Sequence, residues 1–195
     1  MEVAVLPVGC VDFNVLQGVR RGLRKGFPGV RCVVVEKVMS LPENGYDRAR
    51  RQYCSTILLR MIRQFAEGIE VDRVLGVADV DLYAYGLNFV FGEAENPGKT
   101  AIISLYRLRP TFYGQPPNKM LLVQRAVKEA VHEVGHTFGL KHCDNRSCVM
   151  FFSNSIGMVD TKNSKFCRRC SRALNISIRI QIDSCSGSSS NANNA

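Results

Sequence analysis

Tryptophan is absent from the 195-residue sequence, and histidine occurs only three times. The sequence also lacks an uncharged apolar stretch of the ~18 residues that a membrane-spanning helix needs, so no membrane partner is expected. The first residues have no basic leader, and Pro7 interrupts a very short apolar run, which argues against a signal peptide. The expected compartment is therefore the cytoplasm, where cysteine thiols stay reduced.

The overall composition is that of an ordinary globular protein, with 46% hydrophobic and 22% charged residues. This balance argues against the disordered, collagen-like and coiled-coil classes, and the length corresponds to one domain. A chain of this size buries about 70% of its unfolded surface, so it can fold without covalent or metal cross-links. A metal site in this sequence therefore needs a reason other than stability.

Positive charge exceeds negative charge, with 26 lysines and arginines, 17 aspartates and glutamates, and a formal net charge of +9. Such an excess is compatible with nucleic-acid binding. However, the sequence has no block of five or six like charges, and scattered charge is typical of solvated helix faces. We therefore expect no dedicated nucleic-acid site, and we expect a monomer. The scattered arginines include Arg20, Arg21, Arg24, Arg48, Arg50, Arg51, Arg168, Arg169 and Arg172.

Hydrophobic periodicity predicts alternating strands and helices in the first part of the chain. Apolar residues at helical spacing, such as Leu16, Val19 and Leu23, predict a helix, and short apolar runs predict strands. Asp47 is a candidate N-cap for a second helix. This order favours an α/β layer with parallel or mixed strand pairing. The predicted strands are 2–6, 30–38 and 72–81, and the predicted helices are 11–26 and a segment containing Ile57, Leu58, Met61, Ile62 and Phe65.

The middle of the chain adds a predicted hairpin and a long helix. The apolar segments 87–92 and 101–106 are separated by a turn-rich link, which favours a hairpin. A loop containing proline and glycine over 109–117 precedes a helix from about 118 to 139. The region after this helix has little apolar periodicity but many cysteines.

All three histidines lie in the short segment 132–142. On a helix His132 and His136 share one face, so their imidazoles can bind one metal ion. Gly139 can adopt the left-handed conformation that ends a helix, and His142 can then return to the same ion. Three neutral imidazoles and an open position are typical of catalytic zinc, and Glu133 can act there as a general base. A His-Glu-x-x-His pattern alone also arises by coincidence on helix surfaces, but the added glycine and third histidine favour the metal site.

Four of the eight cysteines form two close pairs after the histidines. Cys143 and Cys148 are separated by four residues, and Cys167 and Cys170 by two. Two such pairs predict a closed Cys₄ site for a second, structural zinc ion. The alternative is four buried thiols that act as small hydrophobic side chains, and the polar residues around them argue against it.

The remaining cysteines carry no predicted chemistry. Cys10, Cys32 and Cys54 lie in or beside predicted strands and helices, and we interpret them as small hydrophobic residues. Cys185 has no assigned role. Met150 is compatible with an ordinary core position or with a Met-turn, an apolar floor beneath a zinc site.

The segment from His132 to His142 resembles the metzincin clan of zinc proteases. Its continuation resembles the archaemetzincin family in particular. In that family a cysteine follows the third histidine directly, a second cysteine comes five residues later, a methionine lies two residues beyond, and a Cys-x-x-Cys pair follows. The sequence matches each of these elements over about residues 132–170.

This resemblance implies an α/β (α+β) metzincin-like fold, with a twisted mixed sheet, helices and an active-site helix. A single catalytic domain would span 1–183, divided into an N-terminal subdomain over about 1–139 and a small C-terminal subdomain over about 140–183. The Cys₄ zinc site would stabilise the second subdomain. The Ser- and Asn-rich tail 184–195 is predicted to be disordered. Because the first predicted strand begins almost at once, no inhibitory pro-segment is expected.

The resemblance also implies roles for the motif residues. Two zinc ions per chain are expected, one catalytic and one structural, with Glu133 as general base and Met150 in the Met-turn. Some members of the clan have a tyrosine two residues after this methionine, but the sequence has Phe152, so no oxyanion-stabilising side chain is identified. The implied ligands are His132, His136 and His142 for the catalytic zinc, and Cys143, Cys148, Cys167 and Cys170 for the structural zinc.

In the clan an edge strand lines the cleft and aligns the peptide substrate by strand addition. The candidate for this strand lies within 87–92, and an ordinary interior strand is the alternative. Its proposed substrate-binding residues are Leu87, Asn88, Phe89, Val90 and Phe91.

These features together predict a zinc-dependent metallopeptidase that hydrolyses peptide or protein substrates. The alternative is a non-proteolytic zinc protein whose basic Cys₄ region binds nucleic acid or a protein partner. Glu133 favours the peptidase, because a structural three-histidine site has no need for a carboxylate at that position.

Overall fold

The computed structural model describes the backbone of residues 1–187 and the side chains of residues 1–180. The strands of the main sheet are β1 (Glu2–Val8), β2 (Arg31–Val34), β5 (Arg73–Ala78), β7 (Gly92–Ala94) and β8 (Thr100–Ser104). Their order across the sheet is β2-β1-β5-β8-β7. The pairs from β2 to β8 are parallel, and β7 is antiparallel to β8. The sheet is therefore mixed, as the sequence predicts.

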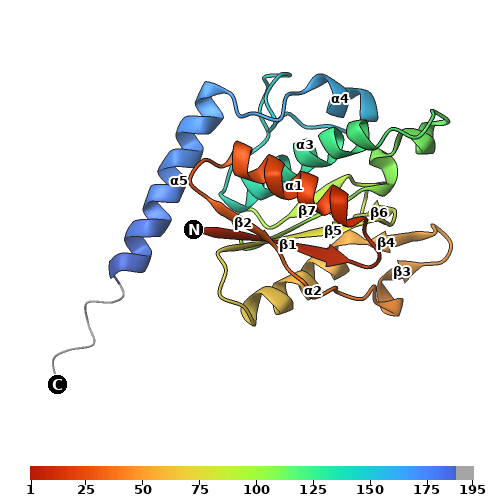
Figure 1. Ribbon diagram of the computed structural model, residues 1–195, viewed down its shortest axis with the longest axis horizontal. Coiled ribbons are helices and arrows are strands. Elements are labelled where there is room, and N and C mark those ends of the chain that lie inside the picture. Colours follow the sequence, from red (N-terminus) through yellow and green to blue (C-terminus); the bar gives the residue numbers. More distant parts are fainter. Residues whose placement is uncertain (188–195) are drawn as a thin grey trace.

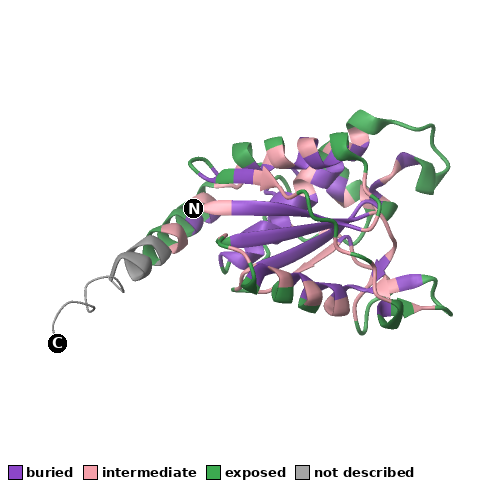
Figure 2. Cartoon of the chain, turned by 60° about the horizontal axis from the view of Figure 1, so that its bottom comes forward, coloured by how far each residue is buried: buried purple, intermediate pink, exposed green. Residues whose placement is uncertain are grey.

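Helices cover both faces of this sheet (Figure 1). The helices α1 (Phe13–Gly26) and α3 (Lys119–Thr137) lie on one face, and α2 (Ser55–Glu67) lies on the other. The strands β5 and β8 are buried along their whole length (Figure 2), since the side chains on both of their faces meet helices.

The helix that will carry two of the histidines is held by close contact with α1. Gly18 and Gly22 lie on the α1 surface that faces α3, where a Cβ atom would overlap the side chain of Val123 or Val127. The absence of side chains at these two positions lets the helices approach closely. Because these two glycines are four residues apart, they lie on one face of α1, and that face packs against α3.

A second, smaller sheet contains β3 (Tyr46–Asp47), β4 (Gln52–Cys54) and β6 (Leu82–Tyr83), in that order, and follows the 3₁₀ turn η1 (Glu43–Gly45). The prediction that Asp47 caps a helix is wrong. Its carboxylate accepts hydrogen bonds from the N–H groups of Ala49 (2.9 Å) and Arg50 (3.0 Å) in the turn between β3 and β4. Aspartate favours such turns for the same reason that it favours helix caps, so local sequence does not separate the two.

The strand predicted over 87–92 is wrong for most of its length, because β7 begins only at Gly92. The residues before it form an irregular segment, 87–91, in which Gln52 Nε2 donates to the Asn88 carbonyl at 3.0 Å. The two phenylalanine rings of this segment pack edge to face with centroids 5.2 Å apart. The alternating apolar residues of this segment therefore pack their side chains together without forming a β-strand.

Other predicted boundaries shift more modestly. A hairpin forms near the predicted place, but its strands are β7 and β8, so Gly92 alone of the predicted first strand takes part. The helix predicted from 118 to 139 corresponds to α3, and the Asn118 side chain accepts a hydrogen bond from Leu121 N–H at 2.9 Å. The strand predicted over 30–38 is shorter and forms an edge of the sheet as β2. The loop region near 109–117 contains the 3₁₀ turns η2 (Tyr106–Leu108) and η3 (Pro110–Tyr113).

The region after α3 is more helical than predicted. It contains α4 (Ile156–Thr161) and α5 (Arg168–Gly187), and Cys170 and Leu174 of α5 are buried in the core shared with α3. Helix α5 extends away from the main body (Figure 1). The first four residues of the predicted tail 184–195 therefore belong to α5, and 188–195 lie outside the described residues. Within the described part of the chain, no helix has the length and apolar character needed to cross a membrane.

A buried ion pair joins the C-terminal region to α3. Lys162 Nζ lies 2.9 Å from Glu129 Oε1, and the two side chains are 0% and 4% exposed. Both charged groups are therefore shielded from water and face each other at close range. Beside it, Arg125 binds Asp160 with two N–O distances of 2.7 Å. These contacts fix the segment after the third histidine against the helix that carries the first two.

Replacing Lys162 with methionine should lower the free energy of unfolding by about 3–5 kcal/mol, because it leaves the Glu129 carboxylate buried without a partner. The double variant Lys162→Met/Glu129→Leu should recover most of this loss, since no uncompensated charge remains. Urea denaturation at fixed metal content measures both, and the exposed Lys165→Met variant should stay within ~0.5 kcal/mol of wild type. Equal stability of the Lys162 and Lys165 variants would contradict this role of the ion pair.

Candidate active site and metal centres

The three histidines converge at the end of α3. His132 and His136 lie one turn apart, and their ring centroids are 4.6 Å apart. The chain leaves the helix through Gly139, whose φ of +83° is the left-handed conformation expected there. This turn brings the His142 ring to 5.4 Å from the His132 ring and 4.9 Å from the His136 ring. One candidate ligand atom from each histidine lies within 4.8 Å of the others.

Backbone carbonyls fix the orientation of the first two rings. His132 Nδ1 lies 2.8 Å from the Val149 carbonyl oxygen, and His136 Nδ1 lies 2.7 Å from that of Leu140. With these Nδ1–H groups donating to carbonyls, the Nε2 atoms are left as acceptors, and they lie 3.1 Å apart. Two nitrogens bound tetrahedrally at ~2.0–2.1 Å from zinc are about 3.3 Å apart. The donor geometry therefore fits zinc.

The protonation of these rings also fits metal binding. Burial lowers the pKa of His136 to about 4, and it lowers the pKa of His132 well below the usual range. Burial lowers the pKa of His142 as well. The three imidazoles are therefore neutral at neutral pH, which is the form that binds zinc.

Glu133 lies beside this cluster and is almost completely buried. Burial raises its pKa well above the usual range; the neighbouring Glu129 and Glu93 add to the shift, and Lys162 opposes it. A divalent cation on the histidines would also oppose the shift, because an opposite charge favours the ionised carboxylate. The position combines a titratable carboxyl group with a candidate metal site.

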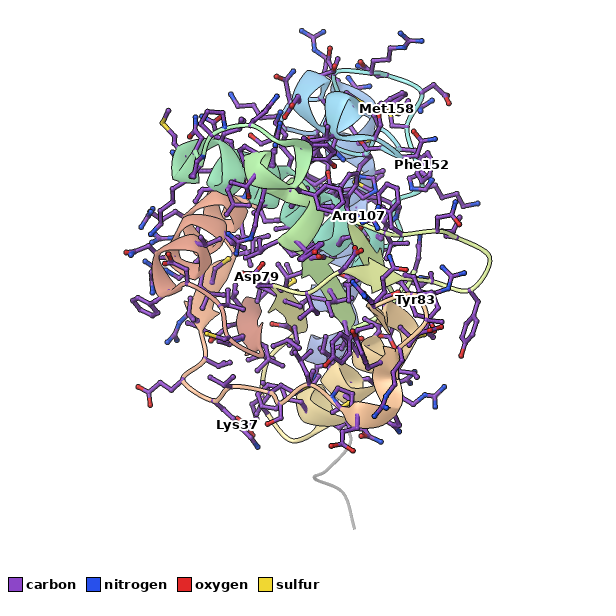
Figure 3. The ribbon with its side chains drawn as sticks, turned by 90° about the vertical axis from the view of Figure 1, so that its right-hand side faces the viewer. Lys37, Asp79, Tyr83, Arg107, Phe152 and Met158 are labelled. Atoms are coloured by element: carbon purple, nitrogen blue, oxygen red, sulfur yellow. The ribbon has the colours of Figure 1, made fainter. Side chains whose placement is uncertain are left out.

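The histidines and Glu133 line one cavity of about 530 Å³. The irregular segment 87–91 and strand β7 form one wall, and Phe152, Ser153 and Asn154 belong to another. Phe152 packs against His142 with ring centroids 4.9 Å apart. In Figure 3 the labelled Phe152 lies on the side of the C-terminal region and Tyr83 on the side of the small sheet. The segment predicted to contact substrate thus lies next to the histidines, although it is not a strand.

The predicted cysteines form a second cluster directly after His142. Cys143, Cys148, Cys167 and Cys170 each offer a sulfur within 4.8 Å of the others. The Sγ atoms of Cys143 and Cys167 are 3.8 Å apart, too far for a disulfide, and thiolates bound tetrahedrally at ~2.3 Å from zinc would lie about 3.8 Å apart. This geometry fits a Cys₄ zinc site.

The pKa values of the Cys148, Cys167 and Cys170 thiols are shifted in different directions. Chiefly through a hydrogen bond from the Cys170 backbone, the pKa of Cys167 is lowered to about 7, whereas burial raises the pKa of Cys148 and of Cys170. Cys148 Sγ accepts a further hydrogen bond from Cys167 N–H at 3.3 Å. The Cys167 thiol therefore ionises most readily of these three, and a bound cation would favour the thiolate forms of Cys148 and Cys170.

The methionine of the motif packs against α3, the helix that carries the first two histidines. Met150 is fully buried, and a Cβ atom added to Gly135 of α3 would lie 2.7 Å from its Sδ. Its carbonyl accepts a hydrogen bond from Cys143 N–H at 2.9 Å. Met150 thus contacts both α3 and the start of the cysteine cluster.

The other cysteine interpretations are partly corrected. Cys32 and Cys54 are buried, as expected for small hydrophobic residues, but Cys10 is exposed. Cys10 follows Gly9 in the connection from β1 to α1, where the chain leaves the buried sheet. Cys185 lies in the part of α5 whose side chains are not described.

Several residues of the site carry no recognisable sequence signal. Asn96 Nδ2 donates to the Leu140 carbonyl at 3.1 Å, the same carbonyl that orients His136. The Glu93 carboxylate is held by hydrogen bonds from the hydroxyl groups of Ser55 and Thr56. Partners from distant parts of the chain define both roles, so no local pattern could have predicted them.

Comparison with known proteins identifies related chains. The model of peptidase family M54 matches residues 5–176. The archaemetzincin of Methanocaldococcus jannaschii is 46% identical over 174 residues, which cover 89% of this chain and 93% of that protein. The crystal structure of archaemetzincin from Methanopyrus kandleri has a TM-score of 0.80 at 38% identity, covering 92% of this chain and 96% of that one.

A zinc-dependent peptidase from Methanocorpusculum labreanum is similar too, with a TM-score of 0.80 at 28% identity, covering 88% of this chain and 99% of that one. The similarity thus extends over nearly the whole fold, and the matched range includes the histidine and cysteine clusters. This relationship supports a zinc metallopeptidase. The chain belongs to peptidase family M54, the archaemetzincins.

Proposed function

We propose that the protein is a metzincin-type peptidase that hydrolyses peptide bonds at the histidine site, with Glu133 as general base. The observation that carries this proposal is the convergence of three neutral imidazoles and one buried carboxylate in a single cavity. A purely structural metal site would need neither the cavity nor the carboxylate.

His132, His136 and His142 would hold the zinc ion, which when bound polarises the scissile carbonyl and lowers the pKa of its water toward ~7. Glu133 accepts a proton from the attacking water and donates it to the leaving amine. The buried surroundings of Glu133 raise its pKa, which helps the carboxyl group hold the proton between these two steps. Phe152 has no hydroxyl group, so this side chain cannot donate to the developing oxyanion.

We place the substrate along β7, an edge strand of the main sheet. Phe91 O and Glu95 N, which flank it, form hydrogen bonds with β8. Because peptide groups alternate along a strand, those of Gly92 and Ala94 point away from β8, and both residues line the cavity. An extended peptide could bind there by strand addition. The segment 87–91 would then form an apolar wall for substrate side chains rather than the pairing strand itself.

The Cys₄ cluster would hold a second, structural zinc ion, giving two zinc ions per chain. It would connect the chain after His142 to the start of α5 and stabilise a C-terminal subdomain of about 140–183. Thiolate ligands of this kind persist in a reducing compartment, which supports a cytoplasmic location. A monomer is sufficient for this proposal, since all proposed ligands come from one chain.

A cleavage assay tests this function. A peptide library is incubated with wild type and with the Glu133→Ala variant, each at known metal content. Cleavage by the wild type alone supports the peptidase. The alternative, a non-proteolytic zinc protein, is supported by an absence of cleavage together with salt-dependent binding of oligonucleotides.

Gly92→Ala should lower kcat by about 10²-fold, because misplacing a catalytic group by ~1 Å can have an effect of this size. The new Cβ atom would lie 2.6 Å from Glu133 Cγ and 2.7 Å from the Ile102 carbonyl oxygen, so the Glu133 side chain must move. Zinc content should not change. The matched control is Gly157→Ala, where an added Cβ meets nothing within 4 Å. Similar kcat values for the two variants would show that Glu133 does not need its observed position.

A further inference from the structure

The edge of the main sheet opposite the candidate active site is also open. Strand β2 forms this edge, and β7 forms the other. Arg31 N–H and Val35 N–H donate to carbonyls of the β1 side, at 3.1 and 3.0 Å. Because peptide groups alternate, those of Cys32 and Val34 point away from β1. The outer edge of β2 therefore presents backbone groups to a possible additional strand.

Strand β2 lies beside helix α1 (Figure 1). Two hollows lie along this edge and are lined by residues of both elements. The first, of about 480 Å³, is mainly apolar and is lined by Phe13 and Leu16 of α1 and by Val34 and Val38 on the strand side. Two of these side chains, Phe13 and Val38, are 63% and 55% exposed. Large exposed apolar side chains around a hollow are typical of interaction sites.

The second hollow, of about 670 Å³, lies farther along the same helix and strand and is basic. It is lined by Arg20 and Arg24 of α1 and by Arg31, Cys32 and Val33. Arg31 lies 3.5 Å from Glu2, but neither Arg20 nor Arg24 forms an ion pair within the described residues.

The two hollows follow one another along α1 and β2, and we call them together the α1–β2 groove. Leu16 in the apolar hollow, and Arg20 and Arg24 in the basic one, follow one another at four-residue intervals on α1, so they lie on one helix face. On the strand side, Val33 and Val34 are consecutive. Glu36 lines the apolar hollow and is the acidic residue that faces this groove.

We propose that the α1–β2 groove is a docking site for an extended acidic segment of a partner protein, which adds as a strand to β2. An apolar anchor would fill the hollow between Phe13 and Val38, and acidic side chains would meet Arg20 and Arg24. Charge complementarity selects this occupant, since the groove contributes three arginines and the chain carries a net charge of +9.

The spacing of the partner sequence follows from the groove. Arginines four residues apart on α1 are separated by ~6 Å along the helix axis, and two residues of an extended strand span about the same length. Side chains two apart on a strand face the same side, so acidic residues two and four positions from the anchor would meet the arginines. Strand β2 runs from the basic hollow to the apolar hollow. In an antiparallel partner strand the apolar anchor residue therefore precedes the acidic residues in sequence. Antiparallel pairing is also the more stable arrangement.

Fluorescence anisotropy with a labelled peptide containing Leu-Thr-Glu-Thr-Glu tests this proposal. The full chain carrying Glu133→Ala is used throughout, so that the probe is not cleaved. Arg20→Gln/Arg24→Gln should weaken binding about tenfold, through the loss of two ion pairs. The matched control, Arg21→Gln/Lys25→Gln, removes the same charge from exposed positions of the same helix and should change binding less than ~2-fold.

Two further measurements separate strand addition from general charge attraction. Peptide binding should slow amide hydrogen exchange at Cys32 and Val34, and the reversed sequence should bind more weakly than the original. The proposal is overturned by equal losses in the two charge variants, by unchanged exchange at β2, or by equal binding of the reversed peptide. It is also overturned if an oligonucleotide displaces the peptide, or if the groove is buried in a dimer in solution. Since binding is measured directly, these results do not depend on the proposed peptidase activity.

Discussion

Replacing Glu133 with alanine is expected to reduce peptide hydrolysis by at least ~10²–10⁴-fold, the usual range for a general acid–base group. The variant removes the one carboxylate adjacent to the first histidine, while the three imidazoles and the carbonyls that orient two of them stay in place. Zinc content should therefore be unchanged. The loss should appear in kcat more than in KM, because proton transfer occurs in the transition state.

The experiment compares wild type, Glu133→Ala and Glu133→Gln on the best peptide found in the library, with zinc measured in each sample. Glu133→Gln keeps the shape of the side chain but removes its basicity, so it should be as inactive as the alanine variant. The control is Glu70→Ala, which changes an exposed glutamate outside the cavity. Cleavage at the wild-type rate by either Glu133 variant would mean that the mechanism is wrong or that the activity comes from a contaminant.

The parts of the site that could be predicted from sequence are the ones specified by short local patterns. His132 and His136 need only a helix to share one face, and Gly139 needs only its permitted left-handed conformation to return His142. The cysteine pairs are similarly local, and the structure brings all four sulfurs together. In each case the chain between the residues is too short or too regular to allow many other arrangements.

The errors arise where a distant partner decides the local structure. Asp47 has a helix-capping side chain, but a neighbouring strand turns the chain there into a hairpin. The alternating apolar residues of 87–91 resemble a strand, yet Gln52 binds the Asn88 carbonyl from another sheet. Helix α5 is not predicted because Ile176, Ile178 and Ile180 alternate with polar residues, which is the period of a strand rather than of a helix.

The buried Lys162 illustrates the same limit in the functional region. A lysine in a polar stretch is usually exposed, and its partner Glu129 lies more than thirty residues earlier. Only the packing of the C-terminal region against α3 brings the two together. Sequence alone therefore predicts candidate ligands for the proposed metals but not the groups that hold those side chains in place.

The second large effect is expected from the cysteine cluster. Cys170→Ser should reduce the metal content from about two zinc ions per chain to about one, if each site is filled as its ligand set requires. It should also destabilise the region from His142 to α5, because binding of a structural zinc can contribute ~10 kcal/mol or more to folding. Cys10→Ser is the matched control, since this exposed thiol lies outside the cluster and should leave both metals bound.

Chelation distinguishes the two sites in the wild-type protein. The histidine site opens into a cavity, so a chelator can reach it directly, whereas the Cys₄ site has no open position. Mild chelation should therefore remove one zinc and abolish hydrolysis while leaving the thermal transition largely unchanged. Elemental analysis and calorimetry before and after chelation measure both effects. One zinc in freshly purified wild type, with the cluster thiols freely reactive, would eliminate the Cys₄ site, because thiolates that share a metal ion are protected from reagents.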